Sequence, residues 1–323
     1  MATKVLVTDH VFHDLDTERA LLEPHGADVA LAPGTTEEEL IEAARDCEAM
    51  LVCFAKVSAS VIAAAAEGGC RIISRYGIGY DNIDIDAATE RGLLVTYVPD
   101  YCLDEVADHA VALLLTLARG VRRAALSVGE GEWAVPHGAV HRLRGRRLAV
   151  IGVGGIGARV VDRARAFGIE PVGFDPYVEE WRVAAERASS FEEAVAEADF
   201  VSLHVPLTDE NRHLIDAESI AGMRRAPIIV NTARGPLVDV DAVVGALDSG
   251  RLGGIGLDVM ETEPPAPDHP LRSHPMAALT PHMAFYSVEA QAELQRRAAE
   301  EVVRALTGQP PDRPVNPEVL ASS

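Results

Sequence analysis

The sequence predicts an α/β protein with two domains, each built around a parallel β-sheet. Short apolar runs alternate with amphipathic stretches along most of the 323 residues. Repeated strand–helix alternation is typical of a parallel sheet covered by helices on both faces. The length corresponds to about two domains, and a longer helical stretch separates a first strand–helix series from a second.

The first series contains four predicted strands, each followed by a helical pattern. One helix is predicted to begin after Thr36, because Glu39 three residues later completes a capping box. Another is predicted to end at Arg91, since Gly92 suits the left-handed conformation that often ends a helix. The predicted strands are Lys4–Thr8, Asp28–Leu31, Ala49–Cys53 and Arg71–Ser74.

The second series follows a helix predicted over Asp104–Arg119, which has acids in its first turn and Gly120 after it. The stretch Val121–Arg147 is polar and shows no clear period. Glu261–Pro281 is rich in proline and is predicted as loop, and a long helical period covers Ser287–Thr307. The strands predicted in this series are Leu148–Ile151, Pro171–Phe174, Phe200–Leu203, Ile228–Asn231 and Gly254–Leu257.

Composition excludes several classes of function. A count of 29 Lys and Arg against 50 Asp and Glu gives a net charge of −21, so we expect no diffuse basic surface for nucleic acid or anionic lipid. The longest membrane-like run, Ala110–Ala118, is far below the roughly 18 residues that span a bilayer. The four cysteines show no disulfide-dense pattern, and no His or Cys spacing indicates a metal site. We therefore expect a protein of the reducing cytoplasm.

A glycine-rich turn in the second series predicts a dinucleotide site. The hexapeptide GVGGIG, residues 152–157, lies between a strand and a helical stretch, and the next strand ends in Asp175, about 20 residues further on. Gly152 permits the tight turn, Gly154 lets the backbone approach a pyrophosphate, and Gly157 allows close helix–strand packing. The helix N-terminus attracts the anion.

Asp175 predicts a preference for NAD over NADP. Its carboxylate can accept hydrogen bonds from the adenosine ribose hydroxyls and would repel a 2′-phosphate. The alternative role for this residue is a turn cap before Pro176. Because the fingerprint begins in mid-chain, the first series is left to bind the substrate.

Three stretches in the second half place polar groups after predicted strands, where ligands bind in open parallel sheets. IIVNTARGPLVD brings Arg234 to a Gly-Pro turn, GIGLDVMETEPP brings Glu263 onto a loop, and LTPHMAFY places His282 after a proline. Each residue also has a structural alternative. These are an ion pair for Arg234, an exposed loop acid for Glu263 and a strand-end cap for His282.

At these residues the sequence resembles the D-isomer-specific 2-hydroxyacid dehydrogenases. The resemblance covers essentially the whole chain, and its motifs stand in family order. The segment TPHMAFYS is most similar to the branch that contains the C-terminal-binding-protein corepressors, which usually have Trp where this chain has Phe285. The motifs are RYGIGYDNID (75–84), the glycine fingerprint, HVPLTDENRHLI (204–215), NTARGPLVD, LDVMETEPP and LTPH.

The resemblance implies the domain organisation. A flavodoxin-like substrate (catalytic) domain is expected from residues 1–102 and 288–323, and a Rossmann-type NAD-binding domain from residues 103–287, with an active-site cleft between them. The family usually forms a homodimer through the NAD-binding domain. The apolar face of the helix at 104–119 is compatible with that contact.

The resemblance also implies the catalytic set Arg234, Glu263 and His282, and the chemistry agrees. Reduction of a 2-keto acid needs a cation to hold the carboxylate and polarise the ketone, which a guanidinium does with two hydrogen bonds. It also needs a proton donor for the developing alkoxide, a role that suits an imidazole. A carboxylate hydrogen-bonded to that imidazole fixes its tautomer and favours its protonated form.

By the same resemblance, two further groups of residues bind ligands. Many members have Arg or Lys where this chain has Gly155, so a side-chain contact to the pyrophosphate is expected to be missing. The implied cofactor-binding residues are Gly152, Gly154, Gly155, Ile156, Gly157, Asp175, His204, Val205, Pro206, Thr232, Ala233 and Asp258. The implied substrate-binding residues are Tyr76, Gly77, Ile78 and Gly79, whose backbone N–H groups suit a carboxylate, and Tyr101.

The favoured function is that of an oxidoreductase that interconverts a 2-keto acid and its D-2-hydroxy acid, acting on CH–OH donors with NAD as acceptor. The main alternative is an NAD(H)-sensing regulatory or scaffold protein like the corepressors. A third interpretation is an oxidoreductase of another acid, such as formate or phosphite. The substrate side chain stays open, because Tyr80, Tyr101, Phe285 and Tyr286 favour an aromatic or long apolar group and Lys56 favours a second acid.

Overall fold

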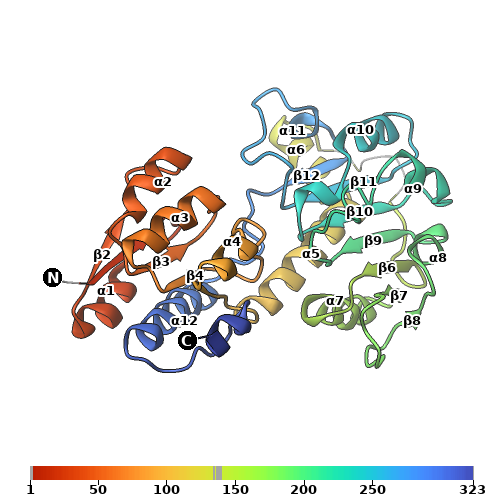
Figure 1. Ribbon diagram of the computed structural model, residues 1–323. Helices are drawn as coiled ribbons and strands as arrows, with labels where there is room; N and C mark the ends of the chain where they lie inside the picture. The colour runs from red at the N-terminus through yellow and green to blue at the C-terminus, as the bar shows by residue number, and fades with distance from the viewer. Residues whose placement is uncertain (1–2, 134, 136–139, 323) are drawn as a thin grey trace. The chain divides into compact units, whose positions relative to one another are not determined.

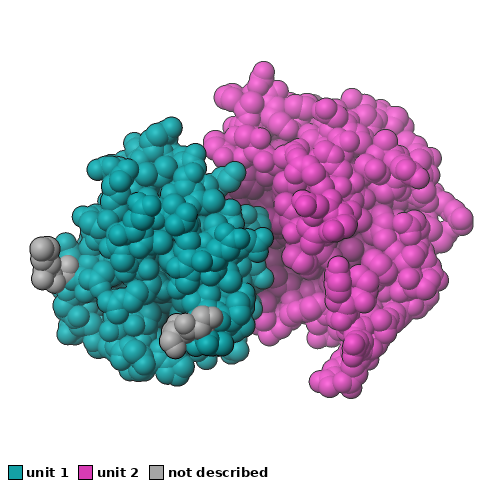
Figure 2. All heavy atoms as spheres, in the orientation of Figure 1, with its two compact units in different colours: residues 1–101, 287–323 teal, residues 102–286 magenta. Residues whose placement is uncertain are grey.

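The protein forms two compact units in the computed structural model, which describes residues 3–133, 135 and 140–322 (Figures 1 and 2). Unit 1 comprises residues 1–101 and 287–323, and unit 2 comprises residues 102–286. These boundaries differ by one residue at each junction from those expected from the sequence. The α/β class with two parallel sheets is confirmed.

Unit 1 is built on a five-stranded parallel sheet in the order β2-β1-β3-β4-β5, which is the order of flavodoxin-like folds. The first four strands lie within one residue of their predicted ends. The fifth was not predicted, because three residues are too short to show a period. The strands are β1 (Thr3–Val7), β2 (Ala27–Leu31), β3 (Ala49–Val52), β4 (Ile72–Arg75) and β5 (Leu94–Thr96).

Helices cover both faces of this sheet (Figure 1). Helices α2 (Glu37–Ala44), α3 (Ala59–Gly68) and α4 (Ile85–Glu90) bury apolar side chains in one cluster with alternate residues of the strands. Helices α1 (Asp16–Leu22) and α12 (Val288–Leu306) contact each other, and α12 packs on β3 and β4. The capping box predicted at the start of α2 is present.

The C-terminal segment belongs to unit 1 because it pairs with the edge strand β5. Pro314 forms an antiparallel bridge to Thr96, and the Val315 N–H donates to the Val95 carbonyl at 2.8 Å. The buried side chain of Asn316 accepts from the Val95 N–H and donates to the Leu93 carbonyl. These contacts explain in physical terms why unit 1 is discontinuous in sequence.

Unit 2 is built on a seven-stranded parallel sheet in the order β12-β11-β10-β9-β6-β7-β8. Apart from the edge strand β12, this is the doubly wound order of a Rossmann fold. The strands are β6 (Arg147–Ile151), β7 (Glu170–Phe174), β8 (Glu186–Arg187), β9 (Phe200–Leu203), β10 (Ile228–Asn231), β11 (Gly254–Leu257) and β12 (Ala277–Leu279).

Helices α5 (Leu103–Ala118) and α7 (Gly155–Ala166) pack together on one face of this sheet. The other face is covered by α8 (Phe191–Ala196), α9 (Ala217–Gly222) and α10 (Val240–Asp248). Alternate residues of the buried strands enter each of the two apolar clusters. The sheet is therefore buried on both sides, as its near-continuous apolar strands predict.

Two predictions for unit 2 were wrong in detail. The stretch expected to lack a period after Gly120 contains helix α6 (Val121–Gly129). The segment expected to be loop contains α11 (Pro270–Ser273) and strand β12. The elements α11 and β12 are four and three residues long, too short to show a period. Helix α6 does place apolar side chains on one face, a pattern that was not recognised in the sequence.

Among the described residues, no helix is long and apolar enough to cross a bilayer. The four cysteines, Cys47, Cys53, Cys70 and Cys102, are buried free thiols.

Candidate active site

The loops that follow β10, β11 and β12 carry the predicted catalytic side chains. These strands are parallel neighbours in the unit 2 sheet. Their carboxyl ends therefore meet at one edge, where ligands bind in doubly wound folds.

The turn after β10 presents Arg234, and Asn231 fixes its shape. The Asn231 side chain is fully buried, donates to the Arg234 carbonyl at 2.7 Å and accepts from the Ala233 N–H at 2.9 Å. The Arg234 guanidinium donates to the Ala233 carbonyl at 2.8 Å. Asn231 was not predicted from the sequence, although an amide at the end of a buried strand could have indicated it.

Gly235 brings the Arg234 turn against the loop after β11. A Cβ at this position would lie 2.0 Å from the Met260 carbonyl carbon and 2.1 Å from its oxygen. Only glycine permits this backbone approach. Because Glu263 follows on the same loop as Met260, the approach explains how Arg234 and Glu263 come close.

Glu263 and His282 form a hydrogen-bonded pair. The Glu263 Oε2 lies 2.7 Å from the His282 Nδ1, and its Oε1 accepts from the Met260 N–H at 2.8 Å. Burial raises the pKa of Glu263, but the His282 hydrogen bond, the Met260 amide and the charge of nearby Arg234 together lower the pKa below its usual value. The structure thus brings the three predicted catalytic residues together.

Asp258 lies beneath the His282 turn and is 2% exposed. Its Oδ1 accepts from the Met283 N–H at 2.9 Å and from the Thr280 hydroxyl at 2.6 Å, and its Oδ2 accepts from the Ala284 N–H at 2.8 Å. These bonds occupy both carboxylate oxygens. In this structure the Asp258 carboxylate therefore stabilises the turn, and its expected contact with the nicotinamide end of the cofactor stays a prediction.

The glycine-rich turn joins β6 to α7 in the geometry that the fingerprint requires. Gly152 has a φ of +87°, and a Cβ on Gly157 would lie 1.9 Å from the Gly152 carbonyl oxygen. Gly154 is the N-cap of α7 and has open space where a Cβ would be. A Cβ on Gly155 would meet Leu103 of α5 at 3.1 Å, so the close α5–α7 packing gives a separate reason for glycine here.

Asp175 and His204 flank this turn. The Asp175 carboxylate accepts from the Val153 N–H and the Tyr177 N–H, both at 3.0 Å, so it also serves as the turn cap that was its alternative role. Burial lowers the pKa of His204 to about 4, which keeps the imidazole neutral near neutral pH. Its Nε2 lies 2.8 Å from the Ser202 hydroxyl.

The residues of this edge fit a bound dinucleotide. The Thr232 hydroxyl oxygen is buried and has no hydrogen-bond partner among the described residues. A buried polar atom of this kind is expected where a ligand supplies the partner. The open space at Gly154 lies at the N-terminus of the 12-residue helix α7, where an anion is stabilised. The Val205 side chain lies beside Gly152, so two predicted cofactor segments meet there.

Unit 1 holds the predicted substrate loop after β4. The Tyr76 N–H donates to Val52 and the Gly77 N–H to Arg75, whereas the amides of Ile78 and Gly79 make no hydrogen bond within the described residues. The Tyr76 hydroxyl donates to Glu18 at 2.7 Å and the ring is buried, so this side chain points into unit 1. Tyr101 is also largely buried, at 8% exposed.

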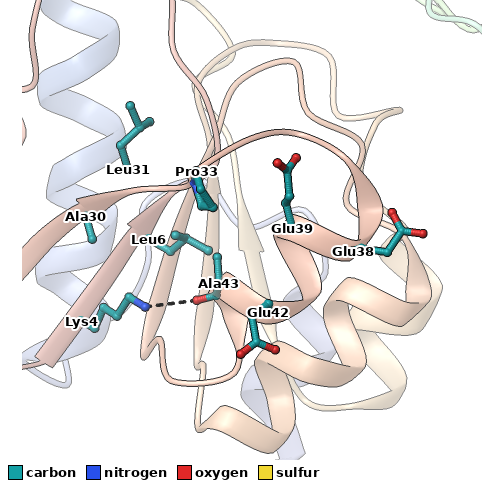
Figure 3. Close-up of a pocket in the computed structure, with 9 residues that line it drawn as sticks. All are labelled: Lys4, Leu6, Ala30, Leu31, Pro33, Glu38, Glu39, Glu42 and Ala43. Atoms are coloured by element: carbon teal, nitrogen blue, oxygen red, sulfur yellow. Dashed lines mark hydrogen bonds between the residues drawn. The ribbon is translucent and has the colours of Figure 1, made fainter.

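A cavity of about 440 Å³ in unit 1 contains none of the predicted site residues (Figure 3). It lies between β1, β2 and α2, and its lysine, Lys4, donates to the Ala43 carbonyl and pairs with Asp46. Glu39, on its rim, closes the capping box of α2. Its lysine and Glu39 are thus used by the fold. No cluster of His, Cys, Asp or Glu in the described parts of the chain could hold a metal ion.

Comparison with known proteins identifies the family. A family model described as "D-isomer specific 2-hydroxyacid dehydrogenase, NAD binding domain" matches residues 111–284. The chain belongs to this family. The match confirms the prediction of NAD for the glycine-rich turn, since the turn lies within the matched segment.

Three relatives illustrate the similarity. D-3-phosphoglycerate dehydrogenase of Methanocaldococcus jannaschii is 39% identical over 97% of this chain. The matched region spans only 59% of the length of that relative. Glyoxylate reductase of Korarchaeum cryptofilum is 38% identical over 88% of this chain and 87% of its own length. The crystal structure of D-lactate dehydrogenase from Aquifex aeolicus, complexed with NAD and lactic acid, has a TM-score of 0.86 at 26% identity, covering 99% of this chain and 98% of that chain. These are dehydrogenases and a reductase, which supports the enzyme interpretation and not the corepressor alternative.

Substitution of Gly157 by alanine is expected to weaken NADH binding. The added Cβ would collide with the Gly152 carbonyl oxygen, so α7 must move away from the turn that receives the pyrophosphate. We expect a Kd for NADH raised at least about tenfold, which corresponds to about 1.4 kcal/mol, measured by fluorescence titration. Gly245→Ala in α10, where a Cβ meets nothing within 4 Å, is the matched control and should leave the Kd unchanged. Unchanged binding by a folded Gly157→Ala protein would contradict the assigned role.

The Glu263 carboxylate should stabilise the protein only above acid pH. Because the pKa of this carboxyl is lowered in the folded protein from its usual value of 4.5, its contribution is present above that value and is lost as pH falls through the folded pKa. The difference in thermal midpoint between wild type and Glu263→Gln should therefore be largest near neutral pH and shrink in acid. Glu67→Gln, at an exposed acid of α3, is the control. A difference that does not change with pH would contradict this interpretation.

Proposed function

We propose that the protein is an NAD(H)-dependent oxidoreductase that interconverts a 2-keto acid and its D-2-hydroxy acid. The observation that carries the proposal is the His282–Glu263 pair at 2.7 Å with Arg234 beside it, in a chain of the D-isomer specific 2-hydroxyacid dehydrogenase family. The set combines a proton donor, a group that fixes its tautomer, and a cation for a carboxylate.

Each of the three side chains has a distinct part in the proposed reduction. Arg234 binds the substrate carboxylate with its guanidinium and polarises the neighbouring ketone oxygen. The Nδ1 of His282 faces Glu263, so the proton goes to the developing alkoxide from Nε2. Glu263 holds the ring in this orientation and stabilises the positive charge of the imidazolium. In the reverse direction His282 takes the hydroxyl proton.

NAD(H) is the redox partner that the proposal requires, and it supplies or accepts the hydride. The N-terminal amides of α7 and the open space at Gly154 are suited to the pyrophosphate. Asp175 is suited to the ribose hydroxyls, and the Thr232–Ala233 segment to the nicotinamide end. The neutral His204 adds no positive charge to this surface, so the backbone is left as the main anion-binding group.

In unit 1, the proposed substrate-binding groups are the amides of Ile78 and Gly79. Both are partly exposed and have no acceptor within the described residues, so they can donate to a substrate carboxylate. Tyr76 and Gly77 then act by holding the loop, since their amides and the Tyr76 hydroxyl are already bonded. A substrate contact of Tyr101 and the active-site cleft between the domains stay predictions.

The substrate is proposed to be a small 2-keto acid. The names of the relatives include a glyoxylate reductase and a D-3-phosphoglycerate dehydrogenase, and one solved structure holds lactic acid. A test panel therefore contains glyoxylate, pyruvate, 3-phosphohydroxypyruvate and the aromatic phenylpyruvate.

His282→Ala is expected to lose most of the reductase activity. Removal of a positioned general acid typically lowers the rate by about a hundredfold or more. The assay follows the loss of NADH absorbance with each acid of the panel. His25→Ala, at an exposed histidine of unit 1, is the matched control and should keep wild-type activity. The proposal fails if the wild type binds NADH and reduces none of the keto acids.

We also propose a homodimer formed through unit 2. Helix α6 buries none of its residues and exposes Val121, Leu126 and Val128, and Trp133 beyond it is 90% exposed. An apolar surface of this kind is typical of a protein–protein interface. The cytoplasmic location and the absence of nucleic-acid partners stay predictions from cysteine usage and net charge.

Leu126→Glu combined with Trp133→Ser should convert the dimer into a monomer. Glutamate at position 126 would bury an unpaired carboxylate in the interface, and serine at position 133 would remove the apolar contact area of the indole. Sedimentation velocity measures the change. Leu320→Glu, at an exposed apolar residue of unit 1, is the control and should remain dimeric. A wild-type protein that sediments as a monomer at micromolar concentration would contradict the proposed dimer.

A further inference from the structure

We infer that His109 is a positioning residue for His282 and acts through the Thr280 hydroxyl and the Asp258 carboxylate. The inference rests on the proposed function, because it concerns the residue that positions the proposed proton donor, His282. His109 lies on α5, remote in sequence from the catalytic motifs, and the sequence did not predict it to be catalytic.

The three side chains form a continuous hydrogen-bonded chain within unit 2. The His109 Nε2 lies 2.9 Å from the Thr280 Oγ1, which lies 2.6 Å from the Asp258 Oδ1. The His109 Nε2 is also 3.6 Å from the same carboxylate oxygen. The Asp258 side chain is 1% exposed and that of His109 is 20% exposed, so water competes little for these bonds.

The direction of each hydrogen bond follows from the number of donors. The Asp258 carboxylate offers only acceptors, so Thr280 donates its single hydroxyl hydrogen to the Oδ1. The Thr280 oxygen must then accept from His109, which requires a hydrogen on the His109 Nε2. A side chain that cannot donate from this place would leave the Thr280 hydroxyl with a free lone pair and more than one orientation.

The hydrogen-bonded chain from His109 to Asp258 ends at the turn that carries His282. His282 has a φ of +51°, a conformation that a residue with a Cβ rarely adopts, and its N–H donates to the carbonyls of Asp258 and Thr280 at 2.8 and 3.0 Å. The next two amides donate to the Asp258 carboxylate. The three consecutive amides of this turn, at residues 282–284, thus donate to Asp258 or Thr280, the two residues that His109 holds in place.

The expected consequence of losing His109 is a misplaced imidazole with ligand binding largely retained. A shift of the general acid by a fraction of an ångström lowers kcat, because proton transfer depends steeply on distance and angle. Arg234 lies on another loop, so the KM for the keto acid should change little. This split separates positioning from a general loss of structure.

The test compares His109→Leu, which removes the donor, with His109→Gln, whose amide nitrogen can take the place of Nε2. We expect kcat to fall about tenfold or more in His109→Leu and to stay within about threefold of wild type in His109→Gln. In both variants the KM for the keto acid should stay within about twofold of wild type. Thr280→Val and Thr280→Ser repeat the comparison from the other side of the bond. The double variant His109→Leu/Thr280→Val should be no slower than the slower single variant, because the two residues act in one chain.

A second readout does not depend on turnover. The Nδ1–H of His282 in its hydrogen bond to Glu263 should give a downfield proton NMR signal in the wild type, and this signal should be lost or broadened in His109→Leu and retained in His109→Gln. If the wild type reduces no keto acid, the proposed function fails while this signal still tests the positioning role. The inference is overturned if His109→Leu and Thr280→Val keep the signal and kcat, if His109→Gln loses as much as His109→Leu, or if the double variant shows additive losses.

Discussion

The buried carboxylate of Asp258 is the interaction on which the candidate site depends. Its two oxygens accept hydrogen bonds from two main-chain amides and one hydroxyl. These bonds stabilise a turn in which His282 has a positive φ. A carboxylate removed from water is stable only with such partners. This turn directs the His282 ring towards the Glu263 carboxylate. The other carboxylate oxygen of Glu263 accepts a hydrogen bond from the Met260 N–H. The geometry of the His282–Glu263 pair, the proposed acid–base group, therefore depends on a buried carboxylate beneath the turn.

Close backbone approaches at two glycines bring the rest of the site to the same edge of the sheet. Gly235 lets the Arg234 turn touch Met260, and Gly157 lets α7 begin against Gly152. In both places a single Cβ would overlap main-chain atoms at about 2 Å, which no flexible side chain could relieve. Arg234 and the helix N-terminus proposed to bind the pyrophosphate are thus positioned by close main-chain contacts at these two glycines.

The sequence predicted the parts of this architecture that repeat or have fixed spacing. The apolar strands of four or five residues and the capping box at Thr36 were predicted because their patterns are local. Arg234, Glu263 and His282 were predicted because they lie in motifs. Strands β5 and β12 are three residues long, so no period marked them, whereas the apolar face of α6 is short and was overlooked among polar residues. The partners of Asp258 are amides 25 and 26 residues away, and His109 meets Thr280 across 171 residues. Contacts of this kind depend on tertiary packing and leave no signal in a single sequence.

The most direct measurement of the central claim is the fate of the hydride. The protein is incubated with pyruvate, 3-phosphohydroxypyruvate or phenylpyruvate, whose reduction creates a stereocentre at C2, and with NADH that carries deuterium at the transferable position of nicotinamide C4. The hydroxy acid is then analysed by mass spectrometry and chiral chromatography. Hydride transfer from the cofactor to a substrate oriented by Arg234 and His282 predicts one deuterium at C2 and only the D-isomer. A product without deuterium, or a racemic one, would contradict the account.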